Sequence, residues 1–180
     1  MSRVRLMAIA VMLPLVSVIA QTQSGKVSGT LTVNGKKLQI RHVSAVTYDT
    51  PNMGQVVSVL LSDNPVDPKK FQEYTRIGAG ERYVPGLVTG AWVTLHVDDK
   101  ALSGFHFTVD AKDQVKLAEV LVGTRDENFG VMDDALVFEA TSKGPRLAGR
   151  IRTKDPIADL GPAKMGIDIT FDAAVVPLGK

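Results

Sequence analysis

Apolar and polar residues alternate in short runs along most of the chain, and the runs end at glycine, proline, asparagine or aspartate. A period of two residues predicts β-strands, because successive side chains of a strand point to opposite faces of a sheet. The sequence therefore predicts an all-β domain of about nine strands with one short helix. Two architectures fit this count, an antiparallel β-sandwich and a flattened up-and-down barrel.

The clearest predicted hairpin surrounds Asn34-Gly35, which has an alternating run on each side. Asn-Gly favours a type I′ turn, because both central residues of that turn need positive φ. This turn places Leu31 opposite Leu38, so the apolar residues of both strands share one face. The other predicted strands are 55–63, 89–97, 102–109, 115–122, 135–141, 147–153 and 167–176.

Strand 55–63 is apolar on both faces, which is typical of a strand that is covered on both sides. A second hairpin is predicted around the loop 142–145, with Phe138 opposite Gly149. The single predicted helix begins at Asp67-Pro68, since Asp is a good N-cap and Pro fits the first helical position.

Residues 1–20 have the layout of a secretory signal peptide: two arginines, then an uncharged apolar run, then a small residue at the end. The run is short for a membrane-spanning helix and is interrupted by Pro14. We therefore expect cleavage after Ala20, and a periplasmic or secreted protein with no transmembrane segment in its mature chain. Residues 21–180 are expected to form a single antiparallel β domain.

The charge balance changes when this segment is set aside. The chain has 21 Lys+Arg and 19 Asp+Glu, and two of the basic residues are Arg3 and Arg5, so residues 21–180 carry 21 − 2 = 19 basic and 19 acidic side chains. A neutral domain gives no support for a nucleic-acid partner. The absence of cysteine excludes disulfides, thiol catalysis and cysteine metal sites.

Several segments resemble an uncharacterised family of exported bacterial all-β proteins. They are the export segment, GTLTVNGK at 29–36, VLLSD at 59–63 before a short helix, and LAGRIRTKD at 147–155 before a terminal strand. The family has no established activity, so the resemblance implies an exported β domain and carries over no functional residues.

Aromatic residues gather on one face of the predicted hairpin 89–109, which is apolar on its other face as well. If this face binds a ligand or a partner, the candidate residues are Trp92, His96, Phe105 and Phe107. The alternative is that the short helix covers the aromatic side chains and completes a second small core.

Catalytic and metal-binding motifs are missing. The three histidines, His42, His96 and His106, have no spacing that brings two metal ligands together, and the acidic segment 125–134 does not fit a calcium-binding EF-hand loop. There is no nucleophile elbow and no phosphate loop. We expect no metal and no cofactor, and we assign no catalytic residue.

Basic residues alternate along the penultimate predicted strand, at Arg146, Arg150, Arg152 and Lys154. One interpretation is a solvated sheet face, with Glu139 of the neighbouring strand close to the arginines. The other is a surface for an anionic partner such as lipid headgroups or an acidic polysaccharide.

The sequence favours a non-catalytic binding or interaction module of the cell envelope, whose partner is an apolar small molecule or a protein. Two alternatives remain: a lipocalin-like carrier of a small apolar ligand, and an envelope hydrolase whose site is assembled from distant loops.

Overall fold

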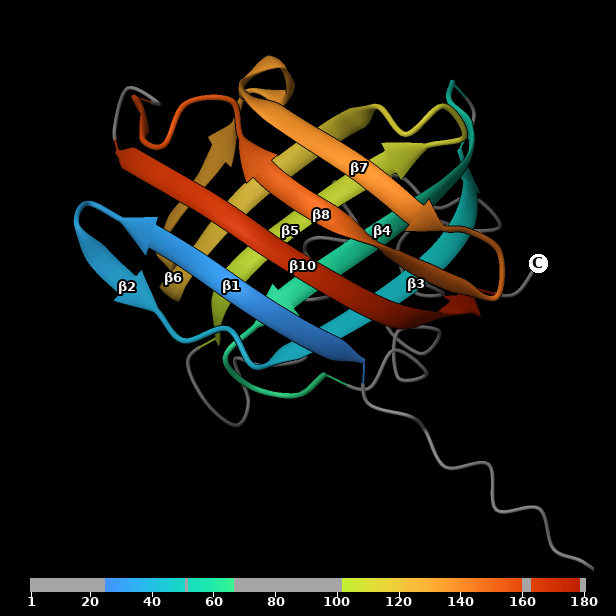
Figure 1. The fold of residues 1–180 in the computed structure, drawn as a ribbon, viewed down its shortest axis with the longest axis horizontal. Coiled ribbons are helices and arrows are strands. Elements are labelled where there is room, and N and C mark those ends of the chain that lie inside the picture. The colour runs from blue at the N-terminus through green and yellow to red at the C-terminus, as the bar shows by residue number, and fades with distance from the viewer. Residues whose placement is uncertain (1–24, 51, 67–101, 160–162, 179–180) are drawn as a thin grey trace, which may run out of the picture.

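The computed structural model describes residues 25–50, 52–66, 102–159 and 163–178 (Figure 1). Within these residues almost the whole backbone is strand, and the one helical element is the short 3-10 turn η2 (Asp133–Ala135). The predicted all-β class is confirmed. The strands are β1 (Lys26–Val33), β2 (Lys36–Leu38), β3 (His42–Thr50), β4 (Gly54–Ser62), β5 (Leu102–Asp110), β6 (Val115–Val131), β7 (Leu136–Ser142), β8 (Arg146–Thr153), β9 (Ala158–Asp159) and β10 (Lys164–Pro177).

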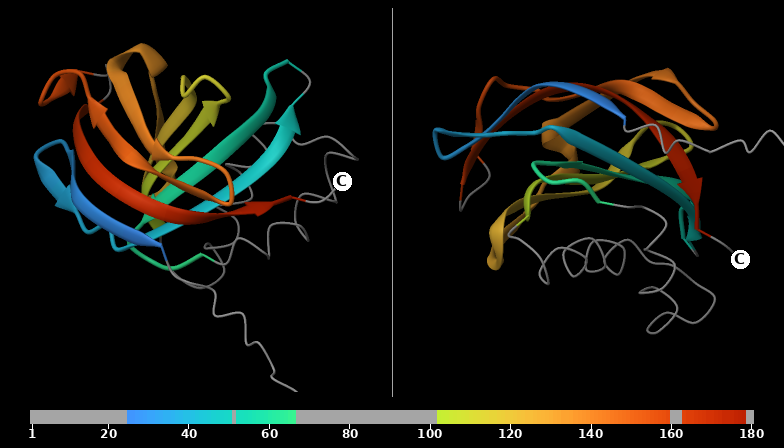
Figure 2. Two further views of the ribbon diagram at one scale, coloured as in Figure 1. Left: turned by 45° about the vertical axis from the view of Figure 1, so that its right-hand side comes forward. Right: turned by 90° about the horizontal axis from the view of Figure 1, so that it is seen from below.

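The strands form one curled sheet whose two halves face each other as layers (Figure 2). We call them layer A, which contains β1, β2, β7, β8, β9 and most of β10, and layer B, which contains β3, β4, β5 and β6. In layer A the last strand lies between β1 and β8, so the strand order differs from that of an up-and-down barrel. Layer B follows the chain order.

Strand β10 joins the two layers. Asp168–Ala174 pair antiparallel with β8, and Val175–Pro177 then pair with β3 of layer B. The pairing with β3 is parallel, so the sheet is mixed and the predicted purely antiparallel arrangement is corrected at this point. The parallel pair arises because a 14-residue strand extends past the end of layer A.

The predicted turn at Asn34-Gly35 is confirmed, with φ angles of 49° and 77°. Leu31 pairs with Leu38 as expected. The second strand of the hairpin ends at Leu38, earlier than the sequence indicates, and the next strand, β3, belongs to layer B.

The hairpin between β7 and β8 has a different register from the predicted one. Phe138 pairs with Ile151, two residues further along β8 than Gly149. The register shifts between Ala140 and Ser142, and this irregularity lengthens the connection. Because the displacement is two residues, each side chain keeps its predicted face.

Two further differences concern the extent of elements. Strand β3 was not predicted, and β6 continues to Val131 through part of the segment that the sequence indicates as an acidic loop. Both faces of β3 are buried over Val43–Val46, so apolar and polar residues do not alternate along this strand. The predicted helix at Asp67 and the predicted strand 89–97 lie outside the described residues.

The main core lies between the two layers and contains a cluster of aromatic rings. The ring of Phe107 is 5.8 Å from that of Phe105, 5.7 Å from that of Phe138 and 5.8 Å from that of Phe171. Phe138 stacks on Phe171 across layer A, and Gly149 leaves room for this, since a Cβ there would be 2.7 Å from the Phe138 ring. These rings join β5 of layer B to β7 and β10 of layer A.

A second apolar cluster covers the other face of layer B. Its buried members are Val46, Tyr48, Val56, Leu60, Val66, Leu102, Leu121 and Leu178. Strand β4 contributes to both clusters, which confirms that this strand is covered on both sides. Searching the described residues for a helix long and apolar enough to span a membrane gives none.

We predict that Phe107→Ala lowers the free energy of unfolding by about 3–5 kcal/mol, because it removes the ring at the centre of the aromatic cluster and leaves a cavity. Phe107→Leu should cost less, since it keeps part of the volume. Urea unfolding followed by circular dichroism measures both.

The matched control is Met132→Ala, which truncates a side chain that is 71% exposed and should change the free energy of unfolding by no more than about 0.5 kcal/mol. Equal effects of Phe107→Ala and Met132→Ala would contradict the assignment of Phe107 to the core.

Candidate functional site

A cavity of about 270 Å³ opens at one end of the fold, where the two layers meet. Its floor is apolar, formed by Val57 and Val109 of layer B and by Leu147 and Val175 of layer A. Polar side chains complete its lining: Thr47, Gln55, Asp110, Asp113 and Lys143. The cavity therefore combines an apolar floor with a charged rim.

The path of β10 shapes this end of the fold. Val175 is the first residue of β10 that pairs with β3, and its backbone N–H donates to the Pro145 carbonyl at 2.9 Å. The strand thus leaves layer A at the residue that lines the cavity. The opening lies at the corner where one strand passes between the layers.

An ion pair crosses the rim. Lys143, in the connection between β7 and β8, lies 2.6 Å from the carboxylate of Asp113, in the connection between β5 and β6. Both side chains are partly exposed, so this ion pair contributes at most about 1 kcal/mol. It links the two layers over the cavity but does not hold them firmly together.

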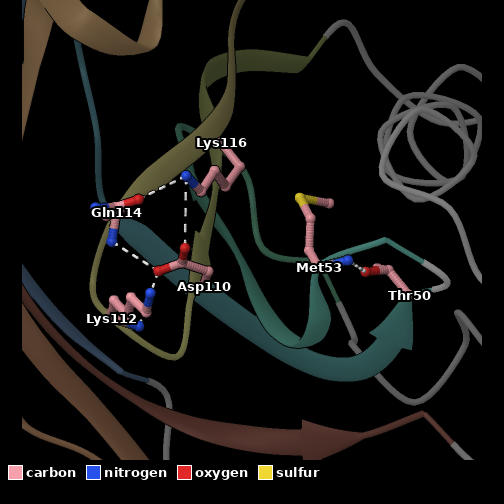
Figure 3. Close-up of polar contacts among 6 residues, drawn as sticks. All are labelled: Thr50, Met53, Asp110, Lys112, Gln114 and Lys116. Atoms are coloured by element: carbon pink, nitrogen blue, oxygen red, sulfur yellow. Dashed lines mark hydrogen bonds and ion pairs between the residues drawn. The ribbon is translucent and has the colours of Figure 1, made fainter.

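Asp110 is a fixed anion on the same rim (Figure 3). Its carboxylate accepts the backbone N–H groups of Lys112 at 2.8 Å and Gln114 at 2.9 Å, and Lys116 lies 3.5 Å away. Burial alone would raise the pKa of this carboxyl, but the hydrogen bonds and the lysine outweigh burial and lower the pKa. The rim therefore carries a permanent negative charge at neutral pH.

A row of polar side chains lies on the other face of layer B. Ser58 of β4 and His106 of β5 share a hydrogen bond of 2.5 Å between Oγ and Nε2. Tyr48 lies on one side of this pair, and Thr108 is the direct cross-strand neighbour of Ser58. Glu119 of β6 is the direct cross-strand neighbour of His106, so the row extends over four strands.

Burial dominates the electrostatics of this row. It lowers the pKa of His106 to about 3 and raises the pKa of Tyr48 to about 12, although hydrogen bonding with Thr108 and Ser58 acts against the shift at Tyr48. His106 is therefore neutral at physiological pH.

A hydroxyl next to a histidine suggests nucleophilic catalysis, but two observations argue against it in this structure. Ser58 and His106 are each fully buried, so a substrate has no contact with either. A general base must also accept a proton, and a pKa of about 3 makes His106 a poor acceptor. The arrangement fits a buried hydrogen-bonding network better than an active site.

Two of the four residues predicted from the sequence as a binding face, Phe105 and Phe107, lie within the described residues. Phe105 and Phe107 are fully buried in the core between the layers, where they contact other side chains and no surface. Trp92 and His96 lie outside the described residues. Within the described residues, no three His, Asp or Glu side chains form a group that could hold a metal ion.

Sequence patterns gave no indication of the cavity, because its lining residues come from five separate stretches of the chain. One signal was present: Asp113, between the predicted strands 102–109 and 115–122, and Lys143, in the predicted loop 142–145, carry opposite charges. Nothing in the sequence says that these two segments meet.

Comparison of the chain with protein-family models, with curated proteins and with solved structures gives no match.

We predict that His106 makes the protein less stable as the pH falls below 6.5. The pKa of His106 is about 3 in the folded state, whereas an unfolded histidine has a pKa of about 6.5. Below pH 6.5 the unfolded state binds a proton that the folded state does not, so the free energy of unfolding falls by about 1.5 kcal/mol between pH 6.5 and pH 5.

Urea unfolding across this pH range should show that His106→Gln removes this loss, because glutamine can still form a hydrogen bond with Ser58 but does not titrate. The control variant is His42→Gln, which changes a partly exposed histidine of the neighbouring strand β3 and should keep the wild-type loss. A wild-type pH dependence in His106→Gln would contradict the prediction.

Proposed function

We propose that this protein is an exported, non-catalytic binding module of the cell envelope that holds a small amphipathic ligand in the cavity between its layers. The observation that carries the proposal is the cavity of about 270 Å³ with its apolar floor and charged rim. The layout of residues 1–20 supports export.

The cavity matches the general form of a small-molecule site, in which apolar side chains bury the ligand and a few polar groups orient it. Its volume lies slightly below the range of about 300–1,000 Å³ that is usual for larger ligands. A short acyl or alkyl chain would lie against Val57, Val109 and Leu147. The polar end of the ligand would stay at the rim, near Lys143 and Asp113.

The rim also indicates how a ligand would enter. The carboxylate of Asp110 already has three partners, so a ligand has little to gain there. Lys143 pairs with Asp113, and both side chains reach solvent. A ligand with a carboxylate can replace Asp113 next to Lys143, and the energetic cost is small because exposed ion pairs are weak.

The hydrolase alternative has weaker support. It would need a nucleophile and a base that substrate can reach, and the Ser58–His106 pair is buried with a weakly basic histidine. For the carrier alternative, Phe107 lies in the packed aromatic cluster and Trp92 lies outside the described residues, so we propose the cavity between the layers as the site of its ligand as well.

We predict that decanoate binds in this cavity and that Val57→Phe weakens the binding at least about tenfold, because the larger ring fills the floor. Methyl NMR spectra of the protein titrated with decanoate should show shifts at Val57, Val109 and Leu147. Decanol and decyltrimethylammonium, which lack the carboxylate, should bind more weakly than decanoate if Lys143 holds the head group.

The control variant is Val137→Phe, which places the same ring on β7 at a half-buried position outside the cavity lining. It should leave the affinity for decanoate unchanged. Two results would refute the proposed site. One is an equal effect of Val57→Phe and Val137→Phe on the affinity for decanoate, and the other is the absence of any shift at the cavity methyl groups.

A further inference from the structure

The outer face of layer A is positively charged although residues 21–180 are neutral as a whole. Alternation along the strands decides which side chains point outward, and the cross-strand register places them together. The basic residues on this face are Lys26, Lys37, Arg146, Arg150, Arg152, Lys154 and Lys164. The acidic residues on it are Glu139, Asp159, Asp168 and Asp172, and Asp155 is exposed next to Lys154 in the same connection. Seven basic and five acidic side chains give this face a net charge of 7 − 5 = +2.

Ion pairs on this face occupy three of its acids. Arg150 binds both carboxylate oxygens of Asp168, at 2.7 and 2.6 Å, which raises the pKa of Arg150 and lowers that of Asp168. Arg146 lies 2.8 Å from Asp172, and Arg152 lies 3.0 Å from Glu139. The arginines are therefore held in place, and the excess positive charge comes from the lysines around them.

A cleft of about 310 Å³ lies in this face next to Arg152 and Lys154. The hydroxyl groups of Thr30 and Thr32 line it from β1. The connection that follows β8 packs closely on β10 here, and this requires Gly166, since a Cβ at that position would be 2.5 Å from the Pro156 carbonyl. The cleft thus combines two cations and two threonine side chains with one carboxylate, that of Asp168, which Arg150 already binds.

The cations are regularly spaced. Arg150, Arg152 and Lys154 occupy alternate positions, and two residues of a strand span about 6.6–6.8 Å. Such a row can face several anionic groups of one linear polymer. The hydroxyl groups on the neighbouring strand are suited to hydrogen bonds with sugar hydroxyls.

An anionic lipid surface fits this face less well. Peripheral membrane binding needs apolar side chains that enter the headgroup region, as well as positive charge. Beside this cleft one large aliphatic side chain, Ile157, is strongly exposed, at 62%. Charge alone would provide only salt-sensitive attraction to a bilayer.

We propose that the outer face of layer A binds an acidic polysaccharide, with a carboxylate or sulfate group of one sugar in the cleft between Arg152 and Lys154. Neighbouring anionic groups of the same polymer lie along the basic row of β8. This site is independent of the cavity between the layers, and either proposal can fail without the other.

The test measures the affinity of size-defined oligogalacturonate and of a heparin octasaccharide by calorimetry at about 20 mM and about 200 mM salt, where screening differs strongly. We expect binding at low salt that weakens at high salt. Lys154→Gln should weaken it about threefold, and Lys154→Glu at least about tenfold.

The matched controls are Lys112→Gln and Lys112→Glu, which make the same charge changes in the exposed connection between β5 and β6. They should leave the affinity within about twofold. Equal losses in the Lys154 and Lys112 variants would show a bulk charge effect and overturn the proposal. Absence of saccharide binding at low salt, or binding to phosphatidylglycerol vesicles without saccharide binding, would also overturn it.

Discussion

The fold depends on a single strand that serves two layers. β10 pairs with β1 and β8 in layer A, and its last residues pair with β3 in layer B. Its inward-facing side chains are buried, among them Ile167, Ile169 and Phe171, and they supply much of layer A's share of the core. At Val175 the strand passes from layer A to layer B, which keeps the layers together at one corner. Val175 also lines the cavity, so the cavity opens at the same corner.

The burial of layer B on both faces has a chemical consequence. A face that holds Ser58, His106 and Thr108 would be polar and hydrated in a half-exposed sheet. Here both faces are buried, so Ser58 and His106 form a hydrogen bond with each other, and His106 loses its charge. The same burial that stabilises the neutral network makes His106 a weak base. Burial and catalysis therefore conflict at this row, which is why the functional proposals lie elsewhere.

The sequence predicted the parts of the fold that short-range rules control. The Asn34-Gly35 turn specifies its own geometry, and alternation in β10 specifies which side chains enter the core. The β7–β8 register was two residues wrong because an irregularity between Ala140 and Ser142 has no clear signal in the residue types. The pairing of β10 with β3 and the position of Phe107 at the centre of the core depend on tertiary contacts, which alternation does not encode. The cavity could not be predicted for the same reason.

The net charge of the sequence also predicts little about how charge is distributed over the folded surface. The balance of 19 basic and 19 acidic residues in 21–180 excludes a strongly basic protein, but it does not describe any one surface. Alternation places Arg150 and Arg152 outward on β8, and pairing with β10 places Asp168 beside them. Three acids of this face, Glu139, Asp168 and Asp172, pair with arginines, whereas Asp110 ends β5 and Asp113 lies in the connection that follows it. A neutral chain thus folds into a protein with a basic outer face, because strand pairing sorts charges that the composition only counts.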